Sequence, residues 1–344
     1  MDHLQNVMGY FDQQQPLCAE HDRIPKDLYR EFGVKAGLRD ENGKGVLAGL
    51  TNISDIRAFQ YVDGVKKPAD GQLLYRGYDV KDLIRGSAGS RFAFEEAGYL
   101  LLFGELPTQE KLDEFCRVLG ECRTMPTNFT RDVIMKAPSH DIMNSMARSV
   151  LTLASYDPLA AALCSLKGPR HGGANLMVMQ MMQNIRENLH DQEDDEELEA
   201  YLKKLLHGEA FDRKGLIYGM GHAVYSLSDP REVVFKGYVE QLAHEKGRDK
   251  DLALYNKIER MAPQLIAEER KIFKGVSPNV DFYSGFVYDM LGIPMELYTP
   301  LFAVARVMGW SAHRIEELLS ANKIIRPAYK SLGGTHEYVR RTER

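Results

Sequence analysis

Apolar and polar residues alternate with a period of two only in a short stretch near the start of the chain. Between Ile53 and Tyr78, the segment Phe59-Gln60-Tyr61-Val62 is followed by the pair Asp63-Gly64 and then by Leu73-Leu74-Tyr75. Aromatic and β-branched residues on both sides of an Asp-Gly pair are typical of a β-hairpin. This stretch therefore predicts short strands or a small hairpin, whereas the polar, turn-rich residues 1–48 predict an arm.

From Asp79 onward, apolar residues recur at i, i+3 and i+4, which predicts helices. Thr108 precedes one such segment, residues 109–119, and its hydroxyl is a suitable N-cap. Thr299-Pro300 predicts another helix start, with threonine as the cap and proline at the first helical position. We therefore expect a mainly α protein with a small N-terminal β element.

Composition excludes several classes of function. The net charge of −5 offers no basic surface for nucleic acid, so an anionic substrate has to be bound by individual arginine or histidine side chains. The cysteines, at positions 18, 116, 122 and 164, form no CxxC pair and no zinc-type spacing, which argues against a metal site or a disulfide framework. No basic start precedes an apolar run, and no stretch approaches the roughly 20 apolar residues of a membrane span. We expect a cytoplasmic protein that binds no metal, membrane or nucleic acid.

Glycines surround His171 in the segment Gly168-Pro-Arg-His-Gly-Gly-Ala-Asn175, which precedes the helical pattern from Leu176. A histidine at a helix N-terminus is kept neutral by the positive end of the dipole, which suits the polarisation of a carbonyl group. For this segment alone, a structural role in the turn is the simpler interpretation.

A second glycine-rich segment, Tyr218-Gly-Met-Gly-His-Ala-Val-Tyr225, contains His222. It is not a dinucleotide fingerprint, because the third glycine and the preceding strand of a βαβ unit are missing. His222 can instead polarise a carbonyl group, and Arg231, nine residues later, can hold a carboxylate through two parallel hydrogen bonds.

A third segment, Pro278-Asn-Val-Asp-Phe-Tyr-Ser-Gly285, places Asp281 at the start of an apolar helical pattern. For the segment alone, Asp281 is best interpreted as an N-cap. The functional alternative is a general base, because apolar neighbours such as Val280 and Phe282 would desolvate the carboxylate and raise its pKa.

In this order the three segments closely resemble the citrate synthase family. The flanking stretches Leu74-Tyr-Arg-Gly-Tyr-Asp79, Leu166-Lys-Gly-Pro-Arg-His-Gly-Gly173 and Leu291-Gly-Ile-Pro294 carry the same resemblance. It extends from about Gly49 to Tyr329 in the order that the family keeps. The match is therefore treated as homology and not as a shared local motif.

The resemblance implies a citrate synthase-like fold of two helical domains. The large domain would consist of residues 49–171 and 286–344, and the small domain of residues 172–285, after the arm at 1–48. Closure of the small domain over the substrate would exclude water until condensation is complete. A homodimer is expected by the same resemblance.

The resemblance also implies the catalytic roles. Asp281 would remove a proton from the methyl group of acetyl-CoA, while His171 hydrogen-bonds the thioester oxygen. His222 would hydrogen-bond and then protonate the ketone oxygen of oxaloacetate.

Arg231 and Arg306 look like carboxylate ligands of the oxaloacetate site, and Arg326 like a ligand donated by the partner subunit. Their alternative interpretation is as ordinary surface or packing arginines. The CoA-binding residues implied by the resemblance are Ile217, Tyr218, Gly219, Met220, Gly221, Lys274 and Asn279.

One catalytic segment of the family has no counterpart here. Family members carry a further active-site histidine in a His-Glu-Gly-Gly-like stretch, but in this chain 151–157 continues directly into 158–164. The family usually has on the order of 80 to 100 residues between these points. His140 matches a different family position and does not replace the missing histidine. Loss of the large-domain helices in that stretch, at the Asp157-Pro158 junction, is expected to expose apolar surface and to threaten dimerisation.

The function implied is that of a citrate synthase, an acyltransferase that condenses acetyl-CoA with oxaloacetate and water at the entry to the tricarboxylic acid cycle. Acetyl-CoA is a substrate, and no cofactor is expected. One alternative is 2-methylcitrate synthesis from propionyl-CoA, because one extra methylene is hard to exclude. Another is a catalytically impaired remnant or binding protein, which the missing histidine segment favours.

Overall fold

The computed structural model describes residues 49–121, 127–139, 141–153, 173–222, 224–272, 275–320, 329–331 and 334–343. The chain divides into two compact units, one of residues 1–51 and 321–330 and the other of residues 52–320 and 331–344. Strands β1 (Gly49–Thr51) and β5 (Tyr329–Ser331) form a two-stranded sheet. The predicted arm lies outside the described residues, and the elements that follow belong to the second unit.

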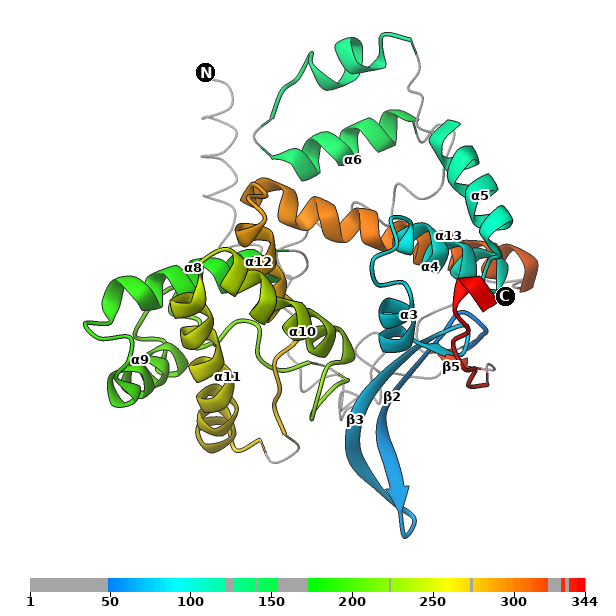
Figure 1. Ribbon diagram of the computed structural model, residues 1–344. Helices are drawn as coiled ribbons and strands as arrows, with labels where there is room; N and C mark the ends of the chain where they lie inside the picture. Colours follow the sequence, from blue (N-terminus) through cyan, green and yellow to red (C-terminus); the bar gives the residue numbers. More distant parts are fainter. Residues whose placement is uncertain are drawn as a thin grey trace, which may run out of the picture. The chain divides into compact units, whose positions relative to one another are not determined.

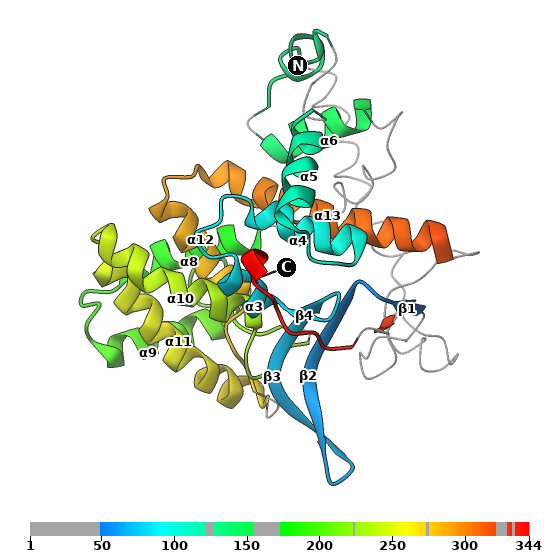
Figure 2. The same cartoon turned by 45° about the vertical axis from the view of Figure 1, so that its right-hand side comes forward.

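A long antiparallel hairpin confirms the predicted β element (Figure 2). Strands β2 (Ser54–Val62), β3 (Val65–Tyr75) and β4 (Tyr78–Asp79) form a sheet in the order β2-β3-β4. At the tip, Asp63 and Gly64 have φ angles of 53° and 75°. Positive φ at both central residues defines the type I′ turn that an Asp-Gly pair favours. The strands are longer than the small hairpin that the sequence predicts.

Helices dominate the rest of the described residues, as the mainly α prediction requires (Figure 1). The α-helices are α3 (Val80–Gly86), α4 (Ala93–Phe103), α5 (Gln109–Glu121), α6 (Ile142–Leu153), α8 (Ala174–Asn188), α9 (Asp195–His207), α10 (Pro230–Glu245), α11 (Asp249–Arg270), α12 (Val280–Met290) and α13 (Tyr298–Ser320). Shorter turns are the π-helix η1 (Thr130–Ile134) and the 3₁₀-helices η2 (Met295–Leu297) and η3 (Arg341–Glu343). The two predicted domain boundaries stay a prediction.

Local capping signals succeed at one helix and fail at another. The Oγ1 atom of Thr108 accepts a hydrogen bond from the backbone N–H of Lys111 at 3.4 Å, which confirms the predicted cap of α5. The predicted start of α13 is wrong by two residues, because the helix begins at Tyr298 and not at Pro300. The 3₁₀ turn η2 leads directly into α13, so Thr299 lies inside the first turn. Pro300 is still tolerated there, since first-turn N–H groups have no helical acceptor.

The helices α8 to α12, named here the helical cluster, share one continuous buried core (Figure 1). Aromatic rings form its centre: Tyr255 stacks on Phe286 with ring centroids 4.6 Å apart and meets Phe282 at 5.2 Å. Around them lie the fully buried side chains of Val178, Met181, Met182, Ile185, Leu198, Leu202, Val239 and Ile258. This core holds the starts of α10 and α12 in place, and both starts carry predicted site residues.

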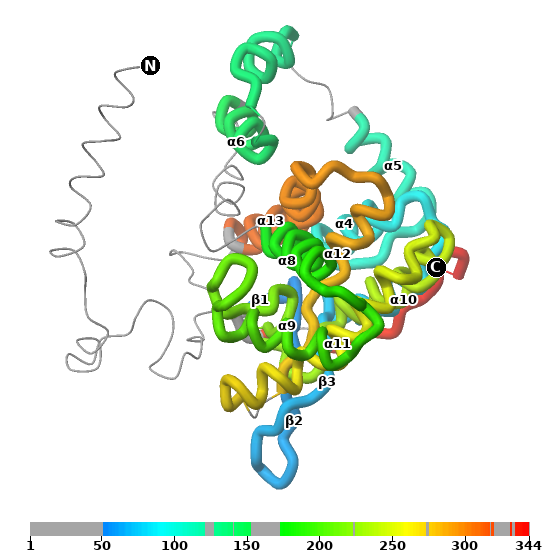
Figure 3. Tube along the Cα trace, turned by 90° about the vertical axis from the view of Figure 1, so that its left-hand side faces the viewer, coloured from blue at the N-terminus to red at the C-terminus, as the bar shows by residue number. Residues whose placement is uncertain are grey.

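The helices α4, α5, α6 and α13 are named here the α13 group (Figure 3). They bury two smaller sets of residues, one of them together with Ile53, which precedes β2. Ile53, Leu101, Met308 and Ala312 form one set, and Met143 with Ala303 forms the other. Several large apolar side chains of the group are exposed: Phe103, Val118, Leu151, Val304, Ile315, Leu318 and Leu319. The α13 group thus has a smaller core than the helical cluster.

Within the described ranges, no helix is both long and apolar enough to span a membrane. The same residues contain no group of three or more His, Cys, Asp or Glu side chains placed to hold a metal ion. Cys116 lies on α5 and is not in a disulfide, while the other three cysteines, His140 and the Asp157-Pro158 junction lie outside the described residues.

Candidate active site

Two chain segments meet to form the frame of the site: the loop 217–221 and the residues just before α12. The backbone N–H of Gly221 donates to the carbonyl of Ser277 at 2.8 Å, and that of Asn279 donates to the carbonyl of Gly219 at 2.8 Å. The side-chain amide of Asn279 also donates to the carbonyl of Gly221 at 2.8 Å. The loop before His222 is therefore fixed to the start of α12, which carries Asp281.

Gly219 allows this close contact. Its φ is 82°, and a Cβ atom at this position would lie 2.9 Å from the Cα atom of Phe282. Both the backbone conformation and the packing therefore require glycine. Gly219 thus serves the packing of the loop on α12, in keeping with the absence of a dinucleotide fingerprint.

His222 has a defined hydrogen-bonding pattern. Its Nδ1 atom accepts from the backbone N–H groups of Val224 at 3.1 Å and Tyr225 at 3.3 Å. A nitrogen that accepts carries no proton, so this pattern assigns the proton of the neutral ring to Nε2. Burial and the positive charge of Arg231 lower the pKa of His222, with the nearby Asp229 opposing them. The ring is therefore a neutral Nε2–H donor near pH 7.

Asp229 orients Arg231. The Nε and Nη2 atoms of Arg231 donate to the two carboxylate oxygens of Asp229 at 3.0 and 2.7 Å. Asp229 is fully buried and also caps α10 by accepting from the backbone N–H of Arg231. Because this pair uses the Nε–Nη2 edge of the guanidinium group, the Nη1–Nη2 edge can bind a substrate carboxylate.

The free edge of Arg231 faces the donor of His222. Nη2 of Arg231 lies 3.3 Å from Nε2 of His222. Since both atoms carry hydrogen in the assigned tautomer, neither accepts from the other. Two converging donors instead define a place for a substrate oxygen.

The aromatic ring of Tyr225 packs against the side chains of His222 and Arg231. Its ring stacks on that of His222 with centroids 5.0 Å apart, and the guanidinium carbon of Arg231 lies 5.7 Å from its centroid. A Cβ atom on Gly71 of β3 would come within 2.6 Å of the Tyr225 ring, so the strand packs directly on this loop. Sequence reasoning missed Tyr225 and Asp229 as site residues, although Asp229-Pro230 is a recognisable cap signal.

Asp281 is not the N-cap of α12, which corrects the simpler interpretation of its segment. The cap is Asn279, whose Oδ1 atom accepts from the backbone N–H of Asp281 at 3.0 Å. Asp281 is the second helical residue, and its carboxylate has no hydrogen bond to any of the described residues. Burial raises the pKa of Asp281, while Arg231 and Arg306 oppose this rise. An unpaired carboxylate with a raised pKa suits a general base.

The charges and aromatic rings around the site come from separate elements. Arg306 is supplied by α13, and its positive charge acts on Asp281 and on Tyr75 at the end of β3. Tyr75 also lies in the field of Arg231, and burial raises the pKa of its hydroxyl. On α12, burial and then the Asp281 charge raise the pKa of Tyr288. The sequence contained no signal for Tyr75 or Tyr288 as site residues.

The structure thus brings together four predicted residues: His222, Arg231, Asp281 and Arg306. His171, Arg326 and Lys274 lie outside the described residues, so their predicted roles stay predictions. The remaining predicted CoA residues, 217–221 and Asn279, form the frame described above.

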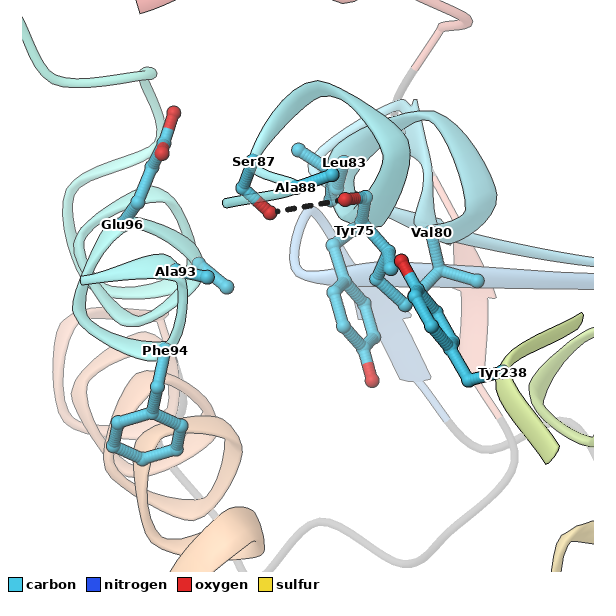
Figure 4. A pocket seen from close by; sticks show the side chains of 11 residues that line it. Tyr75, Val80, Leu83, Ser87, Ala88, Ala93, Phe94, Glu96 and Tyr238 are labelled. Carbon is cyan, nitrogen blue, oxygen red and sulfur yellow. Dashed lines mark hydrogen bonds between the residues drawn. The ribbon is translucent and has the colours of Figure 1, made fainter. Parts of the chain in front are cut away.

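An apolar cavity of about 390 Å³ borders the ring of Tyr75 (Figure 4). Its other walls come from α3, α4 and α10, and they include Val80, Leu83, Phe94 and Tyr238. Tyr75 therefore lines this apolar cavity with its ring and lies within the field of both arginines of the site.

The comparison with protein families agrees with this geometry. The model for "Citrate synthase, C-terminal domain" matches residues 42–159 and 156–328, which together make up most of the chain. The chain belongs to the citrate synthase family. The family model matches in two segments that meet at residues 156–159, where the sequence places the missing stretch.

Individual relatives support the same family. The citrate synthase of Synechocystis is 38% identical over 219 residues, which cover 62% of this chain and 51% of that protein. The chain thus spans about half the length of that relative. The citrate synthase of Haloferax volcanii is 38% identical over 405 positions, covering 87% of this chain and 96% of the relative. This alignment is longer than the 344 residues of the chain, so it must cross a gap in it.

Two further proteins bear on specificity and fold. The 2-methylcitrate synthase 1 of Corynebacterium glutamicum is 28% identical and covers 86% of this chain and 94% of its own length. A citrate synthase of Thermoplasma acidophilum, solved as a ternary complex with carboxymethyl coenzyme A and oxaloacetate, has the same fold. Its TM-score is 0.64 at 23% identity, over 89% of this chain and 98% of that one.

Proposed function

We propose that this chain condenses acetyl-CoA with oxaloacetate and water to give citrate and CoA. The observation that carries the proposal is the convergence of two donors, Nε2 of His222 and Nη2 of Arg231, which lie 3.3 Å apart. A 2-oxo acid has a carboxylate next to a ketone. A carboxylate on the free edge of Arg231 places that ketone oxygen beside the Nε2–H of His222.

Asp281 is the base of the proposed reaction. It takes a proton from the methyl group of acetyl-CoA, and the resulting enol carbon attacks the ketone carbon of oxaloacetate. Its unpaired carboxylate and raised pKa support this role. His171, which the family resemblance assigns to the thioester oxygen, is retained in the proposal from that resemblance alone.

His222 then completes the condensation. As the carbon–carbon bond forms, charge develops on the former ketone oxygen, and the Nε2–H of His222 donates its proton to give the hydroxyl group of citryl-CoA. Water then attacks the thioester and returns a proton to Nε2 of His222, while Asp281 gives the proton it took to the departing CoA thiolate, so that citrate and the CoA thiol are released. A neutral ring donor, as the lowered pKa of His222 provides, avoids placing a second cation beside Arg231.

The proposal also includes the substrates and the assembly. The Thermoplasma relative binds a CoA analogue together with oxaloacetate, which supports the same pair here. A cytoplasmic homodimer in which Arg326 reaches the partner's site is proposed from the family resemblance. Propionyl-CoA is the less favoured acyl donor, because the 2-methylcitrate synthase is 28% identical whereas the two citrate synthases are 38% identical.

A second candidate function is binding of the substrates without turnover. The break in the family match at residues 156–159 favours it, because the family resemblance places a further active-site histidine in a stretch that has no counterpart at this point of the sequence.

Thiol release from acetyl-CoA by the purified protein, with and without oxaloacetate, tests the proposal. We expect oxaloacetate-dependent release, and we expect Asp281→Ala to reduce it by roughly a hundred- to ten-thousandfold, the usual contribution of a general base. Asp289→Ala is the matched control, because it removes a carboxylate from the other end of α12.

The outcomes separate the two candidates. Release that requires oxaloacetate and Asp281 but not Asp289 supports catalysis. A folded protein that binds oxaloacetate but releases no thiol contradicts catalysis and favours the binding function. Faster release from propionyl-CoA than from acetyl-CoA would contradict the proposed acyl donor.

A further inference from the structure

A buried carboxylate lies beside the candidate site and has no role in the proposed chemistry. Glu232 follows Arg231 in the first turn of α10, and it is only 4% exposed. Its Oε1 atom is buried without a hydrogen-bond partner among the described residues. A buried carboxylate in this condition is costly when ionised, so its presence next to a substrate-binding arginine calls for an explanation.

Three more polar side chains link the helices around Glu232. On α10, the ammonium group of Lys236 donates to both carboxylate oxygens of Glu259 on α11, at 2.8 and 2.7 Å. The hydroxyl of the fully buried Tyr283 on α12 donates to the same carboxylate at 2.6 Å. Lys236, Glu259 and Tyr283 thus connect three helices by hydrogen bonds, and together with Glu232, whose charge lies in their field, they are named here the brace.

The brace lies directly behind the site. Glu232 is adjacent in sequence to Arg231, and Tyr283 is two residues from Asp281. The helices α10 and α12, whose first turns carry the substrate arginine and the proposed base, are therefore tied to α11 through one shared carboxylate. A shift in the brace would move both functional side chains together.

The charges around Glu232 come from each packed helix. On α10 they are Lys236 and Asp229, and on α11 Glu259; Tyr283 supplies a titratable hydroxyl from α12. Burial, the Glu259 charge and the Asp229 charge raise the pKa of Glu232 to about 7, with Lys236 opposing them. The cations of α3, Lys81 and Arg85, line a groove against the Val233–Tyr238 side of α10.

The two protonation states of Glu232 differ in their effect on the site. When Glu232 is protonated, Lys236 and Glu259 balance each other. When it ionises, the additional buried negative charge repels the carboxylate of Glu259, which accepts a hydrogen bond from Tyr283. The same charge repels the carboxylate of Asp229, which accepts hydrogen bonds from Arg231. Ionisation therefore acts electrostatically on the carboxylates of both Glu259 and Asp229.

We propose that Glu232 is a positioning residue for the site, and that it must be uncharged for the brace to hold Arg231 and Asp281 in their substrate-binding arrangement. This inference rests on the proposed function, because oxaloacetate is the ligand whose binding it controls. Glu232 itself does not touch the substrate.

The affinity for oxaloacetate, measured by calorimetry at pH 6 and pH 8, tests the inference. For the wild-type protein we expect weakening of at least about fivefold at pH 8, the lower end of typical coupling between two sites. Glu232→Gln keeps the size of the protonated side chain but cannot ionise, so its affinity should change by less than about twofold. Glu240→Gln, on the exposed side of α10, removes the same charge and should behave as the wild type.

A second variant tests the brace without changing a charge. Tyr283→Phe removes the hydrogen bond to Glu259, and we expect about three- to tenfold weaker oxaloacetate binding at pH 6, the net value of one typical hydrogen bond. Wild-type affinity in Tyr283→Phe, or a wild-type pH dependence in Glu232→Gln, would overturn the inference and leave the proposed function standing. Absence of oxaloacetate binding by the wild-type protein at both pH values would overturn both.

Discussion

The helical cluster and the α13 group are built from similar helices but bury their apolar residues to different extents. The cluster has one continuous core around Tyr255, Phe282 and Phe286. The α13 group has two small buried sets, and Leu318 and Leu319 at the end of α13 are 65% and 82% exposed. α6, a member of this group, ends at Leu153, just before the break in the family match.

This difference indicates which part of a shortened chain loses most of its buried core contacts. A family segment without a counterpart at 156–159 would take core partners from flanking helices such as α6, while the helical cluster keeps its own partners. Rigid positioning of catalytic side chains requires a dense core around them. His222, Arg231 and Asp281 all lie on or beside the helical cluster, and Arg306 is the one described site residue that the α13 group supplies.

The largest expected effect is on stability and separates the two cores. Leu202→Ala, at a fully buried position of α9, should lower the free energy of unfolding by about 3 kcal/mol, within the usual range for a buried leucine. Leu318→Ala on α13 should change it by less than about 0.5 kcal/mol. Urea unfolding of both variants measures this. Equal losses would show that another surface covers α13 and that the comparison is wrong.

A second prediction compares helix caps in the two regions. Asp229→Ala removes the α10 cap and leaves Arg231 without its carboxylate, so we expect a loss of about 2 kcal/mol in unfolding free energy, moderated because Arg231 is about a third exposed. Thr108→Ala in the α13 group removes only an exposed cap and should cost about 0.5 to 1 kcal/mol. A smaller loss for Asp229→Ala than for Thr108→Ala would contradict the role assigned to Asp229.

The third prediction concerns pH and a charge of the α13 group, that of Arg306, which acts on Asp281 of the helical cluster. The pKa of Asp281 is raised, and a base works only when ionised, so kcat/KM should fall as pH drops through this raised value. Arg306→Gln removes a cation that opposes the rise, so the acid limb should move to higher pH, by less than about one unit because Arg306 is exposed. An acid limb that stays in place or moves to lower pH would show that α13 does not act on the base.

The smallest expected effect concerns Tyr75, which packs against the core of the α13 group and lies in the field of the site arginines. If its hydroxyl donates to a substrate carboxylate, Tyr75→Phe should raise the KM for oxaloacetate about five- to tenfold with little change in kcat, since the interaction is the same in ground and transition states. Tyr61→Phe on the exposed hairpin is a matched control. An unchanged KM in Tyr75→Phe would remove Tyr75 from the site.

Local signals predicted the elements whose cause lies within a few residues. The Asp63-Gly64 turn depends on the φ preferences of two residues, and the Thr108 cap on one side chain and the helix that follows it. Such local signals do not decide which of two nearby residues caps a helix. Asn279, and not Asp281, caps α12, because an aspartate two residues along can turn its carboxylate into the site.

By itself, the sequence of this protein determined the helical class, the hairpin and, through its family resemblance, four residues that the structure brings together. Only the tertiary structure decided how they act: the tautomer of His222, the edge of Arg231 that stays available, and the contributions of Tyr75, Tyr225 and Asp229. The physical reason is the separation along the chain over which each effect acts. Propensities and spacing act over a few residues, whereas burial, charge and hydrogen-bond geometry at the site depend on β3, α10, α12 and α13 packing together across the chain.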